Sequence, residues 1–109
     1  MAHHYLGTFE ELVLLAILGL GDEAAYAVAI HARVVARTER ATTLGNVYRT
    51  LSRLEKKGYI RSWMGAITHE RGGKRKRLYA CTGTGEAALL ITRDARARMW
   101  HGITLHPSS

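Results

Sequence analysis

Residues 43–82 carry the pattern that most restricts how this chain can fold. It is one apolar helical stripe followed by two strand-like segments around a basic, glycine-containing turn. The stripe recurs at i, i+3, i+4, i+7 and i+10, which is typical of an amphipathic helix, and consists of Leu44, Val47, Tyr48, Leu51 and Leu54. Thr43 is a good N-cap residue, and Lys57 followed by Gly58 suits the C-terminal end. The pattern predicts a helix over 44–57 whose stripe faces the core.

Two segments after this helix have the aromatic and β-branched content of strands, at 59–64 and 77–81. The connection between them is too long for a two-residue turn. It contains Gly65, Gly72 and Gly73. We therefore expect a β-hairpin with a flexible loop at its tip.

Three further segments carry helical signals, at about 8–18, 24–37 and 84–102. The first is apolar on nearly every side, so it needs cover on two sides, from its own core and from a second subunit. The short link 39–42 would join the second and third helices as a helix-turn-helix. The predicted fold class is mainly α with a small β-hairpin: a winged helix-turn-helix plus a C-terminal dimerisation helix.

Particular residues predict the ends and faces of these helices. Thr8 and Glu11 fit a capping box at the first helix, and Gly19 and Gly21 should end it. Thr82 should cap the last helix. Three residues of the second helix recur at i, i+4 and i+8 and should face the core: Tyr26, Ile30 and Val34. The last helix has an alanine-rich seam consisting of Ala88, Ile91, Ala95 and Met99.

The length of 109 residues suits a single folded domain. We expect a DNA-binding domain at 1–82, a dimerisation helix at 83–103 and a flexible tail at 104–109. The longest apolar run, 12–20, is shorter than the ~18 residues that a membrane span requires. No signal-peptide pattern is visible, and the single cysteine fits a reducing compartment. These features predict a cytoplasmic protein with no membrane partner.

Positive charge is concentrated in residues 43–82. That segment holds ten lysines and arginines against two glutamates, a net charge of +8, whereas the whole chain carries +7. The ten are Arg49, Arg53, Lys56, Lys57, Arg61, Arg71, Lys74, Arg75, Lys76 and Arg77. A hairpin tip rich in cations would repel itself unless an anion lay nearby, so the distribution indicates nucleic-acid binding.

An exposed helix with asparagine and arginine in its N-terminal half fits the major groove of double-stranded DNA. Asn46, Arg49 and Arg53 are the candidates for reading bases, and Thr43 is a candidate phosphate anchor. The basic hairpin would hold phosphates or enter the minor groove. The full set of expected DNA-binding residues is Thr43, Asn46, Tyr48, Arg49, Arg53, Lys56, Arg71, Lys74, Arg75, Lys76 and Arg77.

Enzyme chemistry has no specific signal in the sequence. No nucleophile elbow, zinc-protease motif, cysteine pair or phosphate-binding loop is present. The six histidines are scattered and do not form a ligand set, and Cys81 reads as a small buried residue. We expect no enzyme activity, no cofactor and no metal.

Three stretches together resemble the PadR family of bacterial transcriptional regulators: LGNVYRTLSRLEKKGYI at 44–60, GKRKRLY at 73–79 and TGTG at 82–85. The chain is most similar to compact members with a single C-terminal helix. The resemblance implies a winged-helix homodimer, built by the first and last helices, that binds an inverted-repeat operator. It also implies a repressor released by a small ligand. Two positions depart from the usual family pattern: Ala25 replaces glycine, and Arg49 replaces proline.

In some compact family members, aromatic residues of the last helix line a pocket between subunits for flat hydrophobic compounds. Here that resemblance points to Trp100, with Leu89 on the same helix edge, as the candidate site for a small hydrophobic or aromatic effector. A plain packing role for Trp100 in the dimer is an equal alternative. For the whole chain, the alternative function is a winged-helix module that binds an acidic protein and has no operator.

Overall fold

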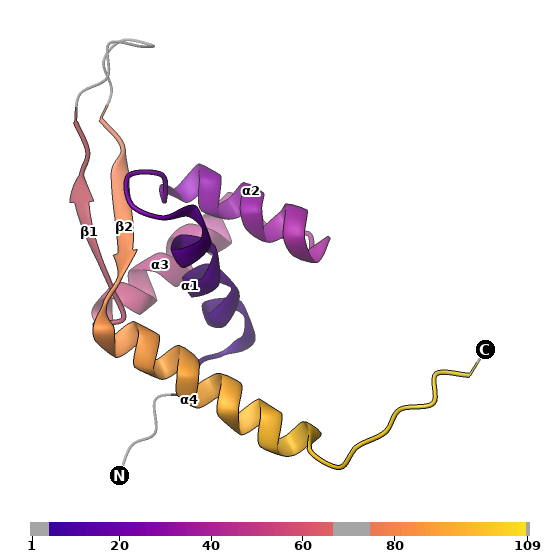
Figure 1. The fold of residues 1–109 in the computed structure, drawn as a ribbon. Helices are drawn as coiled ribbons and strands as arrows, with labels where there is room; N and C mark the ends of the chain where they lie inside the picture. The colour runs from indigo at the N-terminus through magenta and orange to yellow at the C-terminus, as the bar shows by residue number, and fades with distance from the viewer. Residues whose placement is uncertain (1–4, 67–74, 109) are drawn as a thin grey trace.

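The computed structural model describes residues 5–66 and 75–108. In chain order the elements are α1 (Thr8–Leu20), α2 (Ala27–Thr38), α3 (Leu44–Lys56), β1 (Ile60–Met64), β2 (Arg77–Cys81) and α4 (Gly83–Trp100). Figure 1 shows the first three helices gathered beside an antiparallel hairpin, with α4 lying across one end of them. The predicted class, mainly helical with a small β-hairpin, is confirmed.

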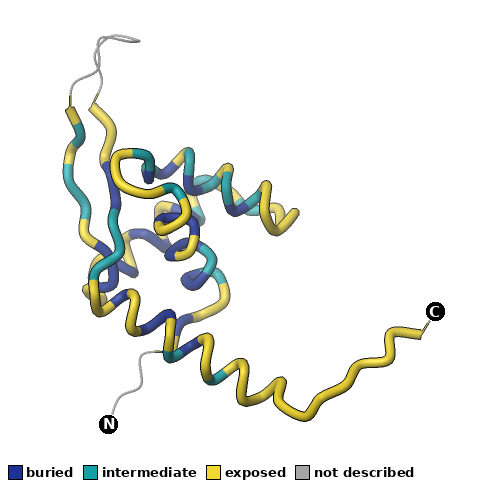
Figure 2. Tube along the Cα trace, in the orientation of Figure 1, coloured by how far each residue is buried: buried dark blue, intermediate teal, exposed yellow. Residues whose placement is uncertain are grey.

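The core forms around α1, which packs against α2, α3, β2 and α4. Its Val13, Leu14 and Ile17 are buried and belong to the same cluster as Leu51 and Leu54 of α3. Figure 2 shows these buried segments meeting in the middle of the molecule. The hairpin runs in register from the pair Ile60–Cys81 to the pair Met64–Arg77. Because α1 touches four elements, it sets the position of α3 relative to the hairpin.

Two of the three predicted caps are confirmed. The Oγ1 atom of Thr43 accepts the N–H of Asn46 at 3.0 Å, and that of Thr82 accepts the N–H of Gly85 at 3.1 Å. These threonines satisfy N–H groups that a helix start leaves without partners.

The predicted N-terminal cap of α1 is wrong, whereas one of the two glycines predicted to end the helix is its C-cap. Its N-cap is Gly7, whose N–H donates to Oε1 of Glu10 at 2.9 Å, so the capping interaction lies one residue earlier than the Thr8–Glu11 pair. Glu11 is unavailable because it pairs with Arg96 of α4. At the other end, α1 continues through Gly19 to Leu20. The second predicted glycine, Gly21, is the C-cap, and its φ of +80° favours glycine.

The helix α2 begins at Ala27, three residues later than predicted. The reason is that the backbone of Ala25 is engaged elsewhere: its carbonyl accepts the N–H of Tyr79 of β2 at 2.9 Å. Ile30 and Val34 are buried as predicted, but Tyr26 is only half-buried and is the N-cap.

The helix α4 has two different halves. Ala88 and Leu89 are buried in the same cluster as the core of residues 6–79, whereas Met99 is 79% exposed. The predicted seam therefore packs only along its N-terminal part. In Figure 1 the last turns of α4 and residues 101–108 extend away from the rest of the chain.

Candidate nucleic-acid interface

The solvent-facing side of α3 is defined by which of its residues are buried. Val47, Thr50, Leu51 and Leu54 point into the molecule. Because residues three and four apart share a helix face, the opposite side is a row that we call the outer row. It consists of Gly45, Arg49, Ser52 and Lys56, all exposed. The periodicity that predicted Arg49 and Lys56 also contained Gly45 and Ser52, which the predicted site omitted.

The two cations of the outer row have no counterion among the described residues. Within residues 5–66 and 75–108, no carboxylate lies within ion-pair distance of Arg49 or Lys56. Both side chains are exposed. An external anion can therefore bind them without breaking an ion pair within the described residues.

Arg53 is differently placed, although it lies one turn after Arg49. Its Nε is 3.6 Å from Oε2 of Glu10, and its Nη2 donates to Oγ1 of Thr50 at 3.4 Å. Lys57 donates to the same Glu10 oxygen at 2.8 Å. The last turn of α3 is thus fastened to the first turn of α1 by an ion pair.

Glu10 is buried, 6% exposed, yet charged partners surround it. Burial by itself would raise the pKa of this carboxyl. The hydrogen bonds from Lys57 and the Gly7 N–H, with the charges of Lys57 and Arg53, outweigh burial and hold the pKa below its usual value. Glu10 is therefore ionised at neutral pH.

Asn46 and Tyr48 lie on the two flanks of the outer row. Asn46 is half-buried, and its Nδ2 donates to Oγ1 of Thr42 at 3.1 Å. Tyr48 is 51% exposed, so the expectation that it faces the core is wrong. Its exposure leaves it accessible beside Arg49, as the DNA-binding prediction requires.

Basic residues at the loop end of the paired strands connect the hairpin to the helices. Arg77 donates to Oγ of Ser62 at 3.0 Å, and Ser62 donates to Oε2 of Glu55 on α3 at 2.8 Å. Lys76 lies over the ring of Tyr26, with Nζ 4.0 Å from the centroid. These contacts fix the direction in which the hairpin leaves the molecule in Figure 1.

Arg75 also contacts its own hairpin, since its Nε donates to the Gly65 carbonyl at 2.8 Å. Arg75, Lys76 and Arg77 are all exposed in spite of their contacts. The predicted site residues Arg71 and Lys74 lie outside the described residues.

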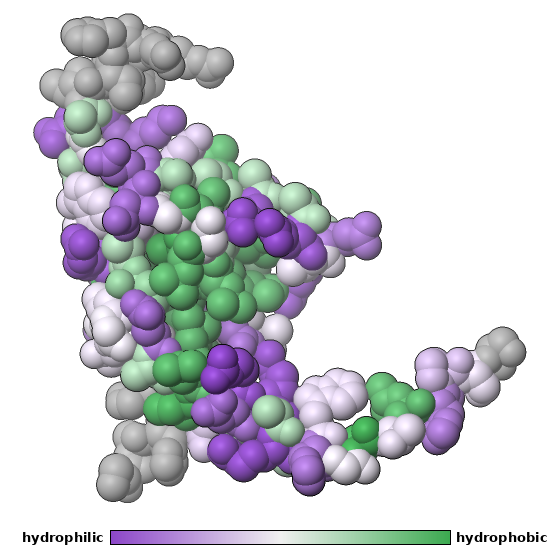
Figure 3. Space-filling model, viewed as in Figure 1, coloured by the Kyte–Doolittle hydropathy of each residue, from purple (hydrophilic) through white to green (hydrophobic). Residues whose placement is uncertain are grey.

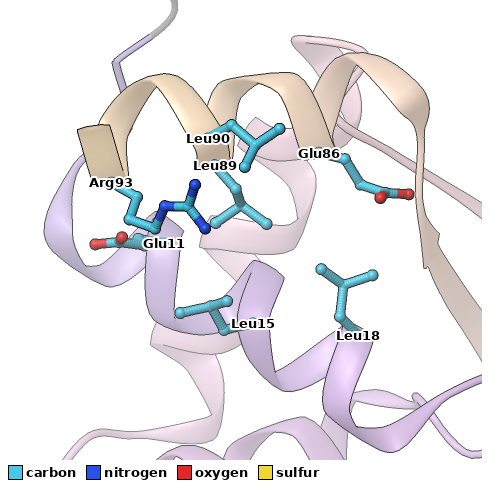
Figure 4. Close-up of a pocket in the computed structure, with 7 residues that line it drawn as sticks. All are labelled: Glu11, Leu15, Leu18, Glu86, Leu89, Leu90 and Arg93. Carbon is cyan, nitrogen blue, oxygen red and sulfur yellow. The ribbon is translucent and has the colours of Figure 1, made fainter. Parts of the chain in front are cut away.

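The two predicted effector residues do not meet within one chain. Leu89 lines a hollow of about 310 Å³ between α1 and α4, together with Leu15, Leu18 and Leu90. Figure 4 shows the leucines of α1 pointing toward those of α4 across this hollow. Trp100 lines a separate hollow at the end of α4, with Met99, Ile103 and Leu105 among its other walls.

Neither a metal site nor a reactive thiol stands out in the described part of the chain. Among residues 5–66 and 75–108, no group of three His, Cys, Asp or Glu side chains could hold a metal ion. Burial, with a smaller contribution from Glu86, raises the pKa of the Cys81 thiol to about 11. In the same residues, no helix has both the length and the apolar character to cross a bilayer.

A helix-turn-helix pair followed at once by a β-hairpin defines the winged-helix class, in which the hairpin is the wing. The chain belongs to the PadR-like family of transcriptional regulators, whose family model matches residues 14–90. The family resemblance predicted from the sequence is therefore confirmed. The family comprises transcriptional regulators, in agreement with the prediction that the chain is not an enzyme.

Solved structures give the same fold. A PadR-like transcription factor from Bacteroides fragilis matches with a TM-score of 0.67 and 22% identity, covering 85% of this chain and 84% of that one. A transcriptional regulator from Clostridium thermocellum matches at 0.68 and 22% identity, covering 84% of each chain. A PadR family regulator from Clostridium difficile matches at 0.65 and 24% identity, covering 84% and 90% respectively. The comparison with curated protein sequences gives no match.

Proposed function

We propose that the protein is a sequence-specific DNA-binding transcriptional regulator that uses α3 as its recognition helix. The observation that carries this proposal is the outer row of α3, whose cations Arg49 and Lys56 are exposed and unpaired within the described chain. The wing adds three exposed cations, Arg75, Lys76 and Arg77. DNA-binding of this kind would place the protein in the cytoplasm with the genome.

Each part of this surface has a distinct task in the proposed complex. An α-helix fits the major groove, where the guanidinium of Arg49 can bind both acceptors of a guanine. The ammonium of Lys56 and the wing cations Arg75, Lys76 and Arg77 would contact phosphates, which position the helix but carry no sequence information. Because phosphate contacts release counterions, affinity should fall steeply as salt concentration rises.

We further propose that the regulator acts as a homodimer on an inverted repeat. Leu15 and Leu18 on α1 and Leu90 on α4 are each between 44% and 50% exposed. Figure 3 shows a broad hydrophobic surface over the middle of the molecule that continues toward α4. The core of the chain covers one side of the apolar α1. A second copy packed on this surface would cover the other side. Two recognition helices would then lie about 34–36 Å apart, one turn of DNA.

Repression relieved by a small hydrophobic effector is the finer part of the proposal. It is supported by the family resemblance and by the exposure of Trp100, which is 55%. A dimer could bring Trp100 of one chain near Leu89 of the other. The substitution Trp100→Ala should leave DNA affinity within about twofold and abolish release of DNA by a flat hydrophobic probe such as anilinonaphthalene sulfonate. Unchanged release would exclude the Trp100 site.

The experiment that tests the main proposal is selection of bound sequences from a pool of random DNA duplexes, followed by fluorescence anisotropy. We expect an inverted-repeat sequence to be enriched. Its affinity should exceed that for a scrambled duplex by about 10³-fold or more at physiological salt. Arg49→Ala should weaken binding to it by about tenfold to a hundredfold, since one bidentate base contact contributes about 1–3 kcal/mol.

A matched control is Arg98→Ala, which removes an exposed arginine of α4 rather than α3. It should change operator affinity by less than about twofold, because a distant exposed charge is screened by salt. Equal binding to every duplex, or equal effects of the two substitutions, would contradict sequence reading by α3. That result would favour the alternative of a winged-helix module for an acidic protein.

A further inference from the structure

Gly45 lies in the first turn of α3, and no packing contact or backbone angle in the described chain requires a glycine there. A Cβ atom added there would meet only Nη1 of Arg49 at 3.7 Å and Oγ1 of Thr43 at 3.9 Å, both ordinary contacts. Its φ lies outside the left-handed region that favours glycine. Glycine disfavours a helix relative to alanine because it loses more backbone freedom on folding. At this position alanine would therefore fit the folded chain better.

Most other described glycines have an internal explanation. A side chain at Gly85 would overlap the backbone carbonyl oxygen of Tyr59, and one at Gly19 would displace the flexible end of the Arg33 side chain. Glycines with positive φ are also explained, and these are Gly21, Gly58 and Gly102. Among the described helical glycines, only Gly45 and Gly83 face space that an alanine could occupy without moving a neighbour.

The two differ in what surrounds them. Gly83 is the first residue of α4, where the preceding Thr82 bonds to Gly58 just past the end of α3. Gly45 belongs to the outer row itself, one turn before Arg49, where the row alternates small residues with cations. Because Gly45 has no side chain, the helix backbone is accessible at this position. The neighbouring guanidinium of Arg49 has no counterion in the described chain.

We propose that Gly45 is the position at which a DNA strand packs directly against the backbone of α3. The inference rests on the proposed DNA-binding function. It adds a specificity-determining residue that acts because it has no side chain. Without a Cβ, a sugar-phosphate strand can approach the first turn closely enough to seat Arg49 against a base edge. A methyl group at Gly45 holds the helix away from the groove, and the contacts of Arg49 lengthen with it.

The test measures stability and operator affinity together in Gly45→Ala and in its matched control Gly83→Ala. Both substitutions should raise Tm by about 2–5 °C, since alanine favours the helix. Only Gly45→Ala should weaken operator binding, by about tenfold or more. Gly45→Leu should weaken it further. The dependence of affinity on salt should keep its slope in all three variants, because no charge is changed.

The outcomes separate this inference from the proposed function. If the unmodified protein selects an operator but Gly45→Ala binds it with unchanged affinity, the inference is wrong and the proposed function stands. If Gly45→Ala lowers Tm, the glycine has a role inside the fold, and the inference is also wrong. If the unmodified protein selects no sequence, both fail. Higher Tm with weaker operator binding, seen in Gly45→Ala and absent in Gly83→Ala, supports the inference.

Discussion

Replacing Glu10 by glutamine should destabilise the fold by an amount that the structure lets us estimate. The carboxylate accepts the Gly7 N–H at 2.9 Å and the Lys57 ammonium at 2.8 Å, and Arg53 lies 3.6 Å away. Glutamine keeps an oxygen for the Gly7 N–H but loses the charge. A hydrogen bond to a charged group contributes about 1.5–3 kcal/mol. The lower end applies, because the Lys57 and Arg53 side chains are 45% and 53% exposed and water replaces part of their interaction.

We therefore expect Glu10→Gln to lower the free energy of unfolding by about 1–2 kcal/mol, which lowers Tm by about 4–8 °C. The loss of stability in Glu10→Gln should become smaller as pH falls. The pKa of Glu10 is lower in the folded chain than its usual value. Its stabilising contribution is therefore complete above the unfolded pKa and is lost as pH falls through the folded pKa. The Tm difference between the two proteins should be constant near neutral pH and should narrow below about pH 4.

The assay is thermal unfolding followed by circular dichroism at a series of pH values. Glu55→Gln is the matched control, because Glu55 is exposed and accepts a bond from Ser62 rather than from a cation. It should change stability by less than about 0.5 kcal/mol. The reasoning fails if Glu10→Gln unfolds at the same temperature as the unmodified protein at pH 7. It also fails if the deficit is just as large in acid.

Three further outcomes follow from local geometry. Gly85→Ala should destabilise the chain by about 3 kcal/mol, because the new Cβ overlaps the Tyr59 carbonyl oxygen; urea denaturation measures this, and a loss below about 1 kcal/mol would contradict it. The thiol of Cys81, with a pKa raised to about 11, should react with iodoacetamide at pH 8 at least about tenfold more slowly in the folded protein than in urea. Similar rates would mean that the thiol is not shielded. Leu18→Glu should convert the proposed dimer to monomer in size-exclusion chromatography, whereas Val28→Glu, on the exposed face of α2, should not; a dimer in both would place the interface elsewhere.

The caps at Thr43 and Thr82 could be predicted because each depends on residues within three positions in sequence. The start of α1 could not. There Gly7 and Glu10 make the capping contact, while Glu11 pairs with Arg96, which is 85 residues away. The α2 boundary moved for a similar reason, since β2 engages the Ala25 carbonyl. Local signals therefore gave the elements correctly and failed where tertiary contacts competed for the same polar groups.

For the candidate site, periodicity predicted the direction of the exposed face of α3 but not its edges. Tyr48 and Thr50 lie at those edges, and the structure exposes the first and buries the second. The ion pair of Arg53 with Glu10 joins two helices and leaves no mark in the local sequence. Leu89 and Trp100 share a helix edge but are eleven residues apart. That is about 16 Å along α4, so the two residues line different hollows although they lie on the same edge of the helix.

The N–H of Leu6 donates to Oγ1 of Thr92 at 3.0 Å, a contact that cannot form early in translation. A ribosome has synthesised all of α1, α2, α3 and the wing before residue 92 emerges. Until then the segment that precedes α1 lacks its acceptor, and Glu11 lacks Arg96. The N-terminus of this fold is therefore completed last, after translation has passed the middle of α4.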